Sequence, residues 1–246
     1  MNDREIFDLY VAQSANVRHL KQVIDQTRNE INLYLRKSNT FQVMAKTKIL
    51  SLLYSAWSEA QFVQIAFTEH GFAYSEIRKI LAIRSDRGIA EGWRFLINSA
   101  LSRVGDVNTN RDLRGRLKKL LSLVKDYIEE PSVLRNKIAH GQWVHAINSK
   151  TTAVNPDVTL LLKNLDFVEI EKRIEIHKYL GFIVRDLVQS PKAGFHRHYW
   201  TNIVFLEQYL KKTLNWTLAS KKTLLLKKPI KINSREPCGV QQLDAT

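Results

Sequence analysis

The segment of residues 46–67 constrains the fold of this chain more than any other part of the sequence. Its apolar residues lie on nearly all sides of a helix, and such a helix is stable in water only when other elements surround it. Glu59 is the one acidic residue inside it. We therefore expect a helical bundle with residues 46–67 at its centre and a partner for Glu59, because an unpaired buried charge is costly.

Apolar residues recur every three or four positions through most of the remaining chain, which is the pattern of amphipathic helices. The longest such stretch predicts one helix over residues 3–37, opened by Asn2 and Glu5 at the spacing of a capping box. Only nine Gly and five Pro occur in 246 residues. Further helices are predicted at about residues 76–83, 88–103, 113–127, 132–140, 166–187 and 196–218.

Two segments depart from this helical pattern. Short apolar runs flank a polar turn at residues 148–150, which predicts a small β-hairpin near residues 142–163. Residues 221–246 have little periodicity and are predicted to form a basic, flexible C-terminal tail. The economical interpretation is one all-α domain over residues 1–220, with its core at about residues 45–190, followed by this tail.

The composition fits a polyanionic partner, and it fits equally a basic protein that needs solubility or binds an acidic partner protein. Lys and Arg total 38 against 24 Asp and Glu, which gives a net charge of +14 and attracts nucleic acid or anionic lipid from a distance. A single cysteine excludes an intrachain disulfide and fits a reducing compartment. No apolar run reaches the length of a membrane span, and the first residues lack the apolar core of a secretion signal. We therefore expect a cytoplasmic protein with no membrane partner.

The motifs of several common site classes are missing. The sequence contains no phosphate-binding loop, no Cys-x-x-Cys, no His-Glu-x-x-His and no Gly-x-Ser-x-Gly. The nearest approach to a metal cluster is His196-Arg197-His198, which has no neighbouring acid or cysteine and is interpreted as two surface histidines on a basic patch. We expect neither a metal site nor a cofactor.

The residues best suited to chemistry lie between Leu134 and Gly141. In a helix, Asn136 and His140 lie one turn apart on one face, and the long side chain of Arg135 can swing towards them. RNA cleavage without a metal needs a base for the 2′-hydroxyl, an acid for the leaving 5′-oxygen and positive charge at the phosphate. Histidine and arginine supply these groups. One chain offers one such histidine for two proton transfers, so either a symmetric homodimer or a water molecule must complete the site.

The run Arg135-Asn136-x-x-x-His140 resembles the signature of the HEPN superfamily, an arginine followed by a polar residue and, four to six positions on, by a histidine. The resemblance implies an up-and-down helical core, a homodimer with facing motif helices, and metal-independent endoribonuclease activity that leaves a cyclic phosphate. It implies that Arg135 and His140 are catalytic and that Asn136 positions them. Such proteins often serve as toxins or antiviral-defence effectors, which suggests an antitoxin or other regulatory protein as a further partner.

A second similarity lies upstream. Tyr54-Ser55-Ala56-Trp57-Ser58-Glu59 is similar to a Tyr-x-x-Trp-Glu helix in some branches of the superfamily, except that the acid comes one residue later. Glu59 is therefore a candidate supporting residue with Arg135 as its partner, although plain core packing also explains Tyr54 and Trp57. The residues predicted to bind the RNA backbone are Arg114, Arg116, Lys118, Lys119 and Lys137.

Two other classes of function stay open. A non-catalytic helical module that binds RNA or protein would use Arg135 and His140 as structural residues. A DNA-binding regulator is disfavoured, because the sequence shows no helix-turn-helix with a basic recognition helix.

Overall fold

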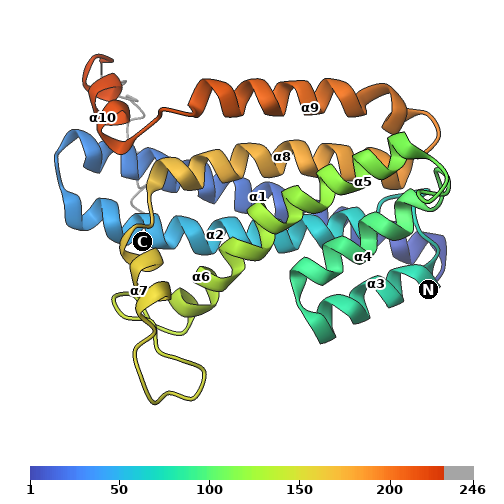
Figure 1. The fold of residues 1–246 in the computed structure, drawn as a ribbon, viewed down its shortest axis with the longest axis horizontal. Coiled ribbons are helices and arrows are strands. Elements are labelled where there is room, and N and C mark those ends of the chain that lie inside the picture. Colours follow the sequence, from blue (N-terminus) through green and yellow to red (C-terminus); the bar gives the residue numbers. More distant parts are fainter. Residues whose placement is uncertain (230–246) are drawn as a thin grey trace, which may run out of the picture.

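The computed structural model describes residues 1–229 (Figure 1), which form helices joined by loops, with a long loop between α6 (Glu130–Ala139) and α7 (Pro156–Lys163). A π-helical turn, η1 (Lys125–Glu129), connects α5 (Arg111–Val124) to α6 without a break. No strand forms within these residues, so the predicted all-α fold is confirmed. The helices are α1 (Asp3–Arg36), α2 (Thr40–Ala66), α3 (Tyr74–Arg87), α4 (Ile89–Leu101), α5 (Arg111–Val124), α6 (Glu130–Ala139), α7 (Pro156–Lys163), α8 (Phe167–Gln189), α9 (Gly194–Thr213) and α10 (Leu218–Leu226).

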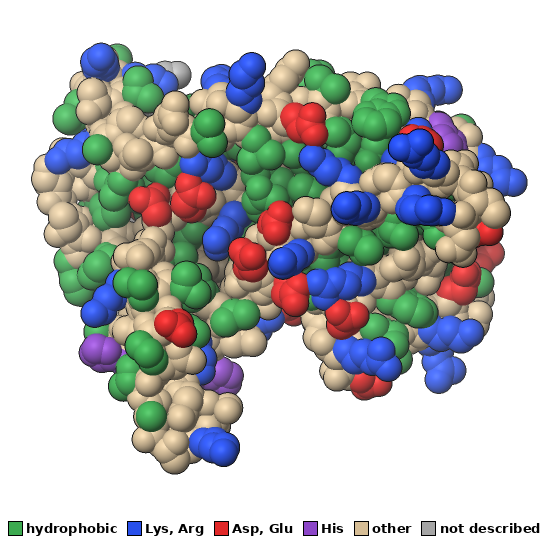
Figure 2. Space-filling view, viewed as in Figure 1, with side chains coloured by type: hydrophobic (Ala, Val, Ile, Leu, Met, Phe, Trp, Pro, Cys, Tyr) green, Lys and Arg blue, Asp and Glu red, His purple; other side chains and the backbone are tan. Residues whose placement is uncertain are grey.

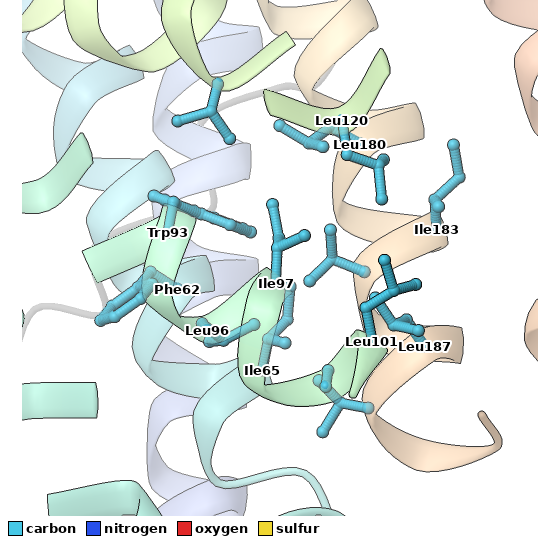
Figure 3. Close-up of a cluster of buried hydrophobic side chains, with 14 of the residues drawn as sticks. Phe62, Ile65, Trp93, Leu96, Ile97, Leu101, Leu120, Leu180, Ile183 and Leu187 are labelled. Atoms are coloured by element: carbon cyan, nitrogen blue, oxygen red, sulfur yellow. The ribbon is translucent and has the colours of Figure 1, made fainter. Parts of the chain in front are cut away.

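Helix α2 lies at the centre of the bundle, as its apolar composition predicted. It packs against α1, α6 and α8 and also touches α3 and α4. Figure 3 shows part of the larger core, in which Phe62 of α2, Trp93 of α4 and Leu180 of α8 pack together and are fully buried. Burial of such side chains is the main force that holds the helices around α2.

The predicted N-terminal helix is confirmed by α1. The Asn2 side chain accepts a hydrogen bond from the Glu5 backbone N–H at 3.0 Å, and the Glu5 carboxylate accepts one from the Asn2 N–H at 2.7 Å. This reciprocal pair satisfies two N–H groups that a helix start otherwise leaves without partners. The buried residues of α1, which include Ile24 and Ile31, pack in a second apolar cluster with Trp57 of α2.

The predicted β-hairpin over residues 142–163 is wrong. Ile147 and Val154 form one isolated antiparallel bridge, and the second half of the segment is helix α7. The Asn155 side chain caps α7 by accepting a hydrogen bond from the Val158 N–H at 3.1 Å. Pro156 stands in the first turn, where a missing N–H costs nothing. These two residues begin a helix at the point where the prediction placed a strand.

The predicted start of the flexible tail at residue 221 is also wrong. Helix α10 includes Lys221, whose ammonium group pairs with the buried Glu171 carboxylate of α8. Leu218 and Leu225 of the same helix pack against the cluster formed by α1 and α2. The ordered bundle therefore continues through α10, and residues 230–246 of the predicted tail lie outside the described residues.

No helix within residues 1–229 combines the length and the apolar character needed to cross a bilayer.

Candidate functional site

Helix α6 carries the motif, and its C-terminal end is fixed by a glycine. Gly141 has a φ of 77°, a left-handed conformation that side chains disfavour. Its N–H donates to the Ile138 carbonyl at 3.1 Å, and the Gln142 N–H donates to the Lys137 carbonyl at 2.9 Å. This pair of bonds is a Schellman motif. It ends the helix directly after His140 and holds that residue at the helix terminus.

The N-terminal side of α6 is anchored to α2 through the backbone carbonyl of Tyr127, four residues before a proline. Pro131 has no N–H to bond the Tyr127 carbonyl four residues earlier. The buried Tyr54 hydroxyl of α2 donates a hydrogen bond to that carbonyl instead. Burial raises the pKa of Tyr54, so the hydroxyl stays protonated and remains a donor. Tyr54, singled out in the sequence by its similarity to a family helix, thus positions α6.

Glu59 of α2 binds two arginines at once. Its Oε1 pairs with Nη2 of Arg135 on α6, and its Oε2 pairs with Nη2 of Arg84 on α3 at 3.0 Å. The Glu59 side chain is 25% exposed and that of Arg135 is 31% exposed, so the cluster lies at the edge of the core. The expected pairing of Glu59 with Arg135 is present, and Arg84 is a third member that the sequence analysis missed.

Asn136 and His140 lie on a different face of α6 from Arg135. Both side chains are exposed, and they stand one turn apart, with the His140 N–H donating to the Asn136 carbonyl at 3.2 Å. No side-chain hydrogen bond within residues 1–229 joins Arg135 to either residue. Within one chain, the Asn136 amide and the His140 imidazole are therefore neighbours on the exposed face of α6. The Arg135 guanidinium is bound to Glu59 instead.

A second charged cluster braces η1, the turn that leads into α6. Arg94 of α4 donates to Glu91 at 2.5 Å and also to Glu129. Burial alone lowers the pKa of Arg94, but the hydrogen bonds and charges of the two carboxylates outweigh it and raise the pKa. The spacing of Glu91 and Arg94 along one helix signals their pairing in the sequence. Nothing in the sequence signals Glu129 as the third member.

The loop after His140 is tied back to α6 and α2. The Trp143 indole donates to the Ile138 carbonyl at 3.0 Å, and Lys137 donates to the Ile147 carbonyl at 2.5 Å. Lys48 of α2 donates to the Trp143 carbonyl, and burial lowers the pKa of this lysine. Lys137, predicted to bind RNA, is thus engaged in holding the loop.

The other residues predicted to bind RNA lie on α5, away from the motif. Arg116 is buried and pairs with Asp112 at 2.8 Å, and Lys119 pairs with Glu207 of α9 at 2.9 Å. Arg114 is exposed, but its guanidinium donates to two carbonyls of the preceding loop. Lys118 is exposed. The structure therefore does not bring these cations to His140, and of the four only Lys118 makes no hydrogen bond or ion pair through its side chain within residues 1–229.

Large apolar side chains are exposed around the motif. They belong to α6, to the loop that follows it and to α7, and each is between 44% and 60% exposed. Single exposed apolar residues are ordinary, but a group of them near one site marks an interaction surface. The members are Val133, Val144, Val154, Leu160 and Leu161.

The candidate site consists of Arg135, which is paired with Glu59, and the exposed side chains of Asn136 and His140. Within residues 1–229 no three His, Cys, Asp or Glu side chains gather as metal ligands would. His198 pairs with Asp186 at 2.9 Å, and His196 lies 3.4 Å from Arg116, so these histidines are held by protein groups. Comparison of the chain with protein-family models, with curated proteins and with solved structures finds no match.

Proposed function

We propose that this protein is a metal-independent endoribonuclease of the HEPN type, in which Arg135, Asn136 and His140 form the reactive site. The observation that carries the proposal is the geometry of α6. This helix ends at His140, exposes the imidazole and Asn136 one turn apart, and holds Arg135 in an ion pair with Glu59. These are the groups that the sequence motif selects, each on the helix that the resemblance requires.

The proposed reaction uses one titratable group on each side of the phosphate. The His140 imidazole takes the proton of the 2′-hydroxyl, the 2′-oxygen forms a bond to phosphorus, and the bond from phosphorus to the 5′-oxygen breaks. A second acid gives a proton to the departing 5′-oxygen. The products are a 2′,3′-cyclic phosphate and a 5′-hydroxyl. Arg135 stabilises the crowded phosphate through the guanidinium donors that Glu59 does not use.

A second copy of the chain supplies the second acid in this proposal. A homodimer with facing α6 helices places two His140 side chains at one site. The exposed apolar residues around the motif, Val133 and Leu160 among them, are suited to such an interface. The resemblance further suggests a toxin or an antiviral-defence effector in the cytoplasm, restrained by an antitoxin or another regulatory protein.

The test is cleavage of total cellular RNA by the parent protein and by the His140→Ala variant. The matched control is His19→Ala, because His19 is an exposed histidine on α1, far along the chain from the motif. We expect the parent and His19→Ala to cut RNA and His140→Ala to be inactive while its oligomeric state, measured by light scattering, is unchanged. An active His140→Ala variant contradicts the assignment.

One observation favours a second candidate, a non-catalytic RNA- or protein-binding module. Arg135 is engaged by Glu59, and the His140 backbone belongs to a helix cap, so both residues also have structural roles. In that case Arg135→Gln lowers the free energy of unfolding, and neither the parent nor any variant cuts RNA. Cleavage by the parent protein separates the two candidates, because Arg135→Gln loses the ion pair with Glu59 and is inactive in both.

A further inference from the structure

Helices α5 and α9 border a surface hollow that the nuclease site does not use. This hollow, here the α5–α9 hollow, has a volume of about 600 Å³. In Figure 2, hydrophobic side chains gather between the positions of α5 and α9, and basic side chains border them over α5. The residues that line the hollow are Arg111, Asp112, Gly115, Arg116, Lys119, Tyr199, Trp200, Ile203 and Glu207.

Trp200 is the prominent aromatic group of the hollow. It is 54% exposed, although a side chain of this size gains stability from burial. The Arg116 guanidinium lies 5.6 Å from the Trp200 ring and 4.7 Å from the Tyr199 ring, and the two rings meet edge to face at 5.1 Å. Arg116 is itself fixed by Asp112. The exposed indole is therefore held in place from beneath by a buried, charge-paired arginine.

Gly115 leaves the floor of the hollow open. A glycine inside a helix is destabilising relative to alanine, and here neither packing nor a left-handed backbone accounts for it. A Cβ built on Gly115 meets no atom within 4 Å. The position lines the hollow on the exposed side of α5. Its effect is to leave the α5 side of the hollow without a side chain at this position.

The charge around the hollow is positive. The two acids that line it are both paired, Asp112 with Arg116 and Glu207 with Lys119. Arg111 and Lys118 on α5 and Arg197 on α9 are exposed, and none of them forms an ion pair within residues 1–229. Of these three cations, Arg111 lines the hollow, and Lys118 and Arg197 are on the two helices that border it. An exposed aromatic group together with unpaired cations is the combination with which proteins bind single-stranded nucleic acid.

We propose that the α5–α9 hollow binds single-stranded RNA, with an unpaired base stacked on Trp200 and backbone phosphates on Arg111, Lys118 and Arg197. Stacking on an indole requires a base that is not paired in a duplex. Helix α5 continues through η1 into α6, so Arg116 and Arg135 lie roughly 28 Å apart along this continuous helical rod. If the bound RNA is the nuclease substrate, the proposal rests on the function proposed above. Binding of RNA at the hollow itself is argued only from the residues of the hollow.

The experiment measures binding of a fluorescein-labelled twelve-nucleotide single-stranded RNA by anisotropy, in the His140→Ala background so that the RNA stays intact. We expect Trp200→Ala to weaken binding about tenfold and Trp200→Phe to restore most of the loss, because a ring is kept. The matched control is Trp216→Ala, since Trp216 is also partly exposed but lies beyond α9. We expect this control to bind as its background does.

The contribution of charge is tested with two double variants. Arg111→Gln with Lys118→Gln should weaken binding and reduce its salt dependence, whereas Arg78→Gln with Lys79→Gln, which removes two exposed cations from α3, should do neither. The proposal is contradicted if both double variants lose the same affinity for RNA. It is also contradicted if duplex RNA competes with the labelled strand as well as single-stranded RNA does, or if the protein binds phosphatidylserine vesicles and not RNA.

The outcomes separate this inference from the proposed nuclease. If RNA binding depends on Trp200 and the protein cuts no RNA, the RNA-binding role of the hollow is supported and the nuclease function is contradicted. Cleavage that depends on His140, with RNA binding that is unchanged by Trp200→Ala, supports the nuclease and contradicts the hollow.

Discussion

The Glu59 carboxylate holds the Arg135 guanidinium next to α2 and α3, while His140, five residues later, is exposed at the end of the same helix. The guanidinium and the imidazole therefore lie on two separate surfaces of one short helix. In the proposed nuclease this separation calls for a second copy of α6 to complete the site. The same proposal gives Glu59 the role of positioning Arg135.

Replacing Glu59 tests this positioning. Glu59→Gln leaves Arg135 and Arg84 without a carboxylate, and because all three side chains are partly exposed we expect a loss of only about 1 kcal/mol in the free energy of unfolding. Cleavage should fall at least tenfold, because Arg135 is no longer held. The matched control is Glu69→Gln, an exposed acid whose one ion pair is with the neighbouring His70. Denaturation in urea and initial cleavage rates measure both effects, and unchanged cleavage in Glu59→Gln contradicts the positioning role.

The acid sensitivity of the fold should depend on His177. This residue is fully buried against the rings of Trp57, Trp93 and Tyr54, and burial lowers its pKa to about 3. Below pH 6.5 the unfolded chain binds a proton there that the folded chain does not bind, so the folded state loses stability as the pH falls. The loss is about 1.4 kcal/mol per pH unit, or about 2 kcal/mol between pH 6.5 and 5.

Urea denaturation at pH 7 and pH 5 measures this effect in the parent and in His177→Phe. We expect the variant to show a smaller difference between the two pH values. His19→Ala serves as the control, because it removes an exposed histidine and should keep the full difference. A His177→Phe variant with the same pH dependence as the parent shows that other groups cause the acid sensitivity.

Two glycine-to-alanine substitutions should have opposite effects on stability. Gly141→Ala forces a side chain into the left-handed region and should cost about 1 kcal/mol, with weaker cleavage because the end of α6 shifts at His140. Gly115→Ala, in an ordinary helical conformation with open space around it, should gain about 0.5–1 kcal/mol. Thermal denaturation of the two variants side by side measures the contrast. Equal effects argue against the helix cap at Gly141.

The bond between Tyr54 and Tyr127 should be worth more than an ordinary surface contact. Tyr54→Phe removes the donor to a carbonyl that Pro131 cannot satisfy, and we expect a loss of about 1–2 kcal/mol in the free energy of unfolding. Tyr34→Phe is the control, because within residues 1–229 that hydroxyl makes no hydrogen bond. Similar losses in the two variants contradict the anchoring of α6 by Tyr54.

The sequence predicted those features that follow from local pattern. The central position of α2 follows from apolar residues on all its sides, and the pairing of Glu59 follows from the cost of an unpaired buried charge. The hairpin was predicted wrongly because Val158 and Leu160 alternate as in a strand, although Asn155 and Pro156 form a helix start. That start was visible in the sequence and outweighs the alternation.

Other features depend on contacts between distant parts of the chain, which a single sequence does not reveal. The α10 segment has little periodicity of its own. It is held in place by the contact of Lys221 with Glu171, fifty residues earlier. Arg116 stands among exposed cations in the sequence and yet is buried under the rings of α9. Asp112, one turn before it, was the only local sign that Arg116 is paired.

The most direct test of the central claim is the chemistry of the RNA ends. Purified parent, His140→Ala and His19→Ala proteins are incubated with total RNA in EDTA, and the fragment ends are identified by mass spectrometry. We expect 2′,3′-cyclic phosphate and 5′-hydroxyl ends from the parent and from His19→Ala, and intact RNA with His140→Ala. Cyclic phosphate ends produced equally by His140→Ala, or cleavage by the parent only when a divalent metal is supplied, contradict a metal-independent site centred on His140.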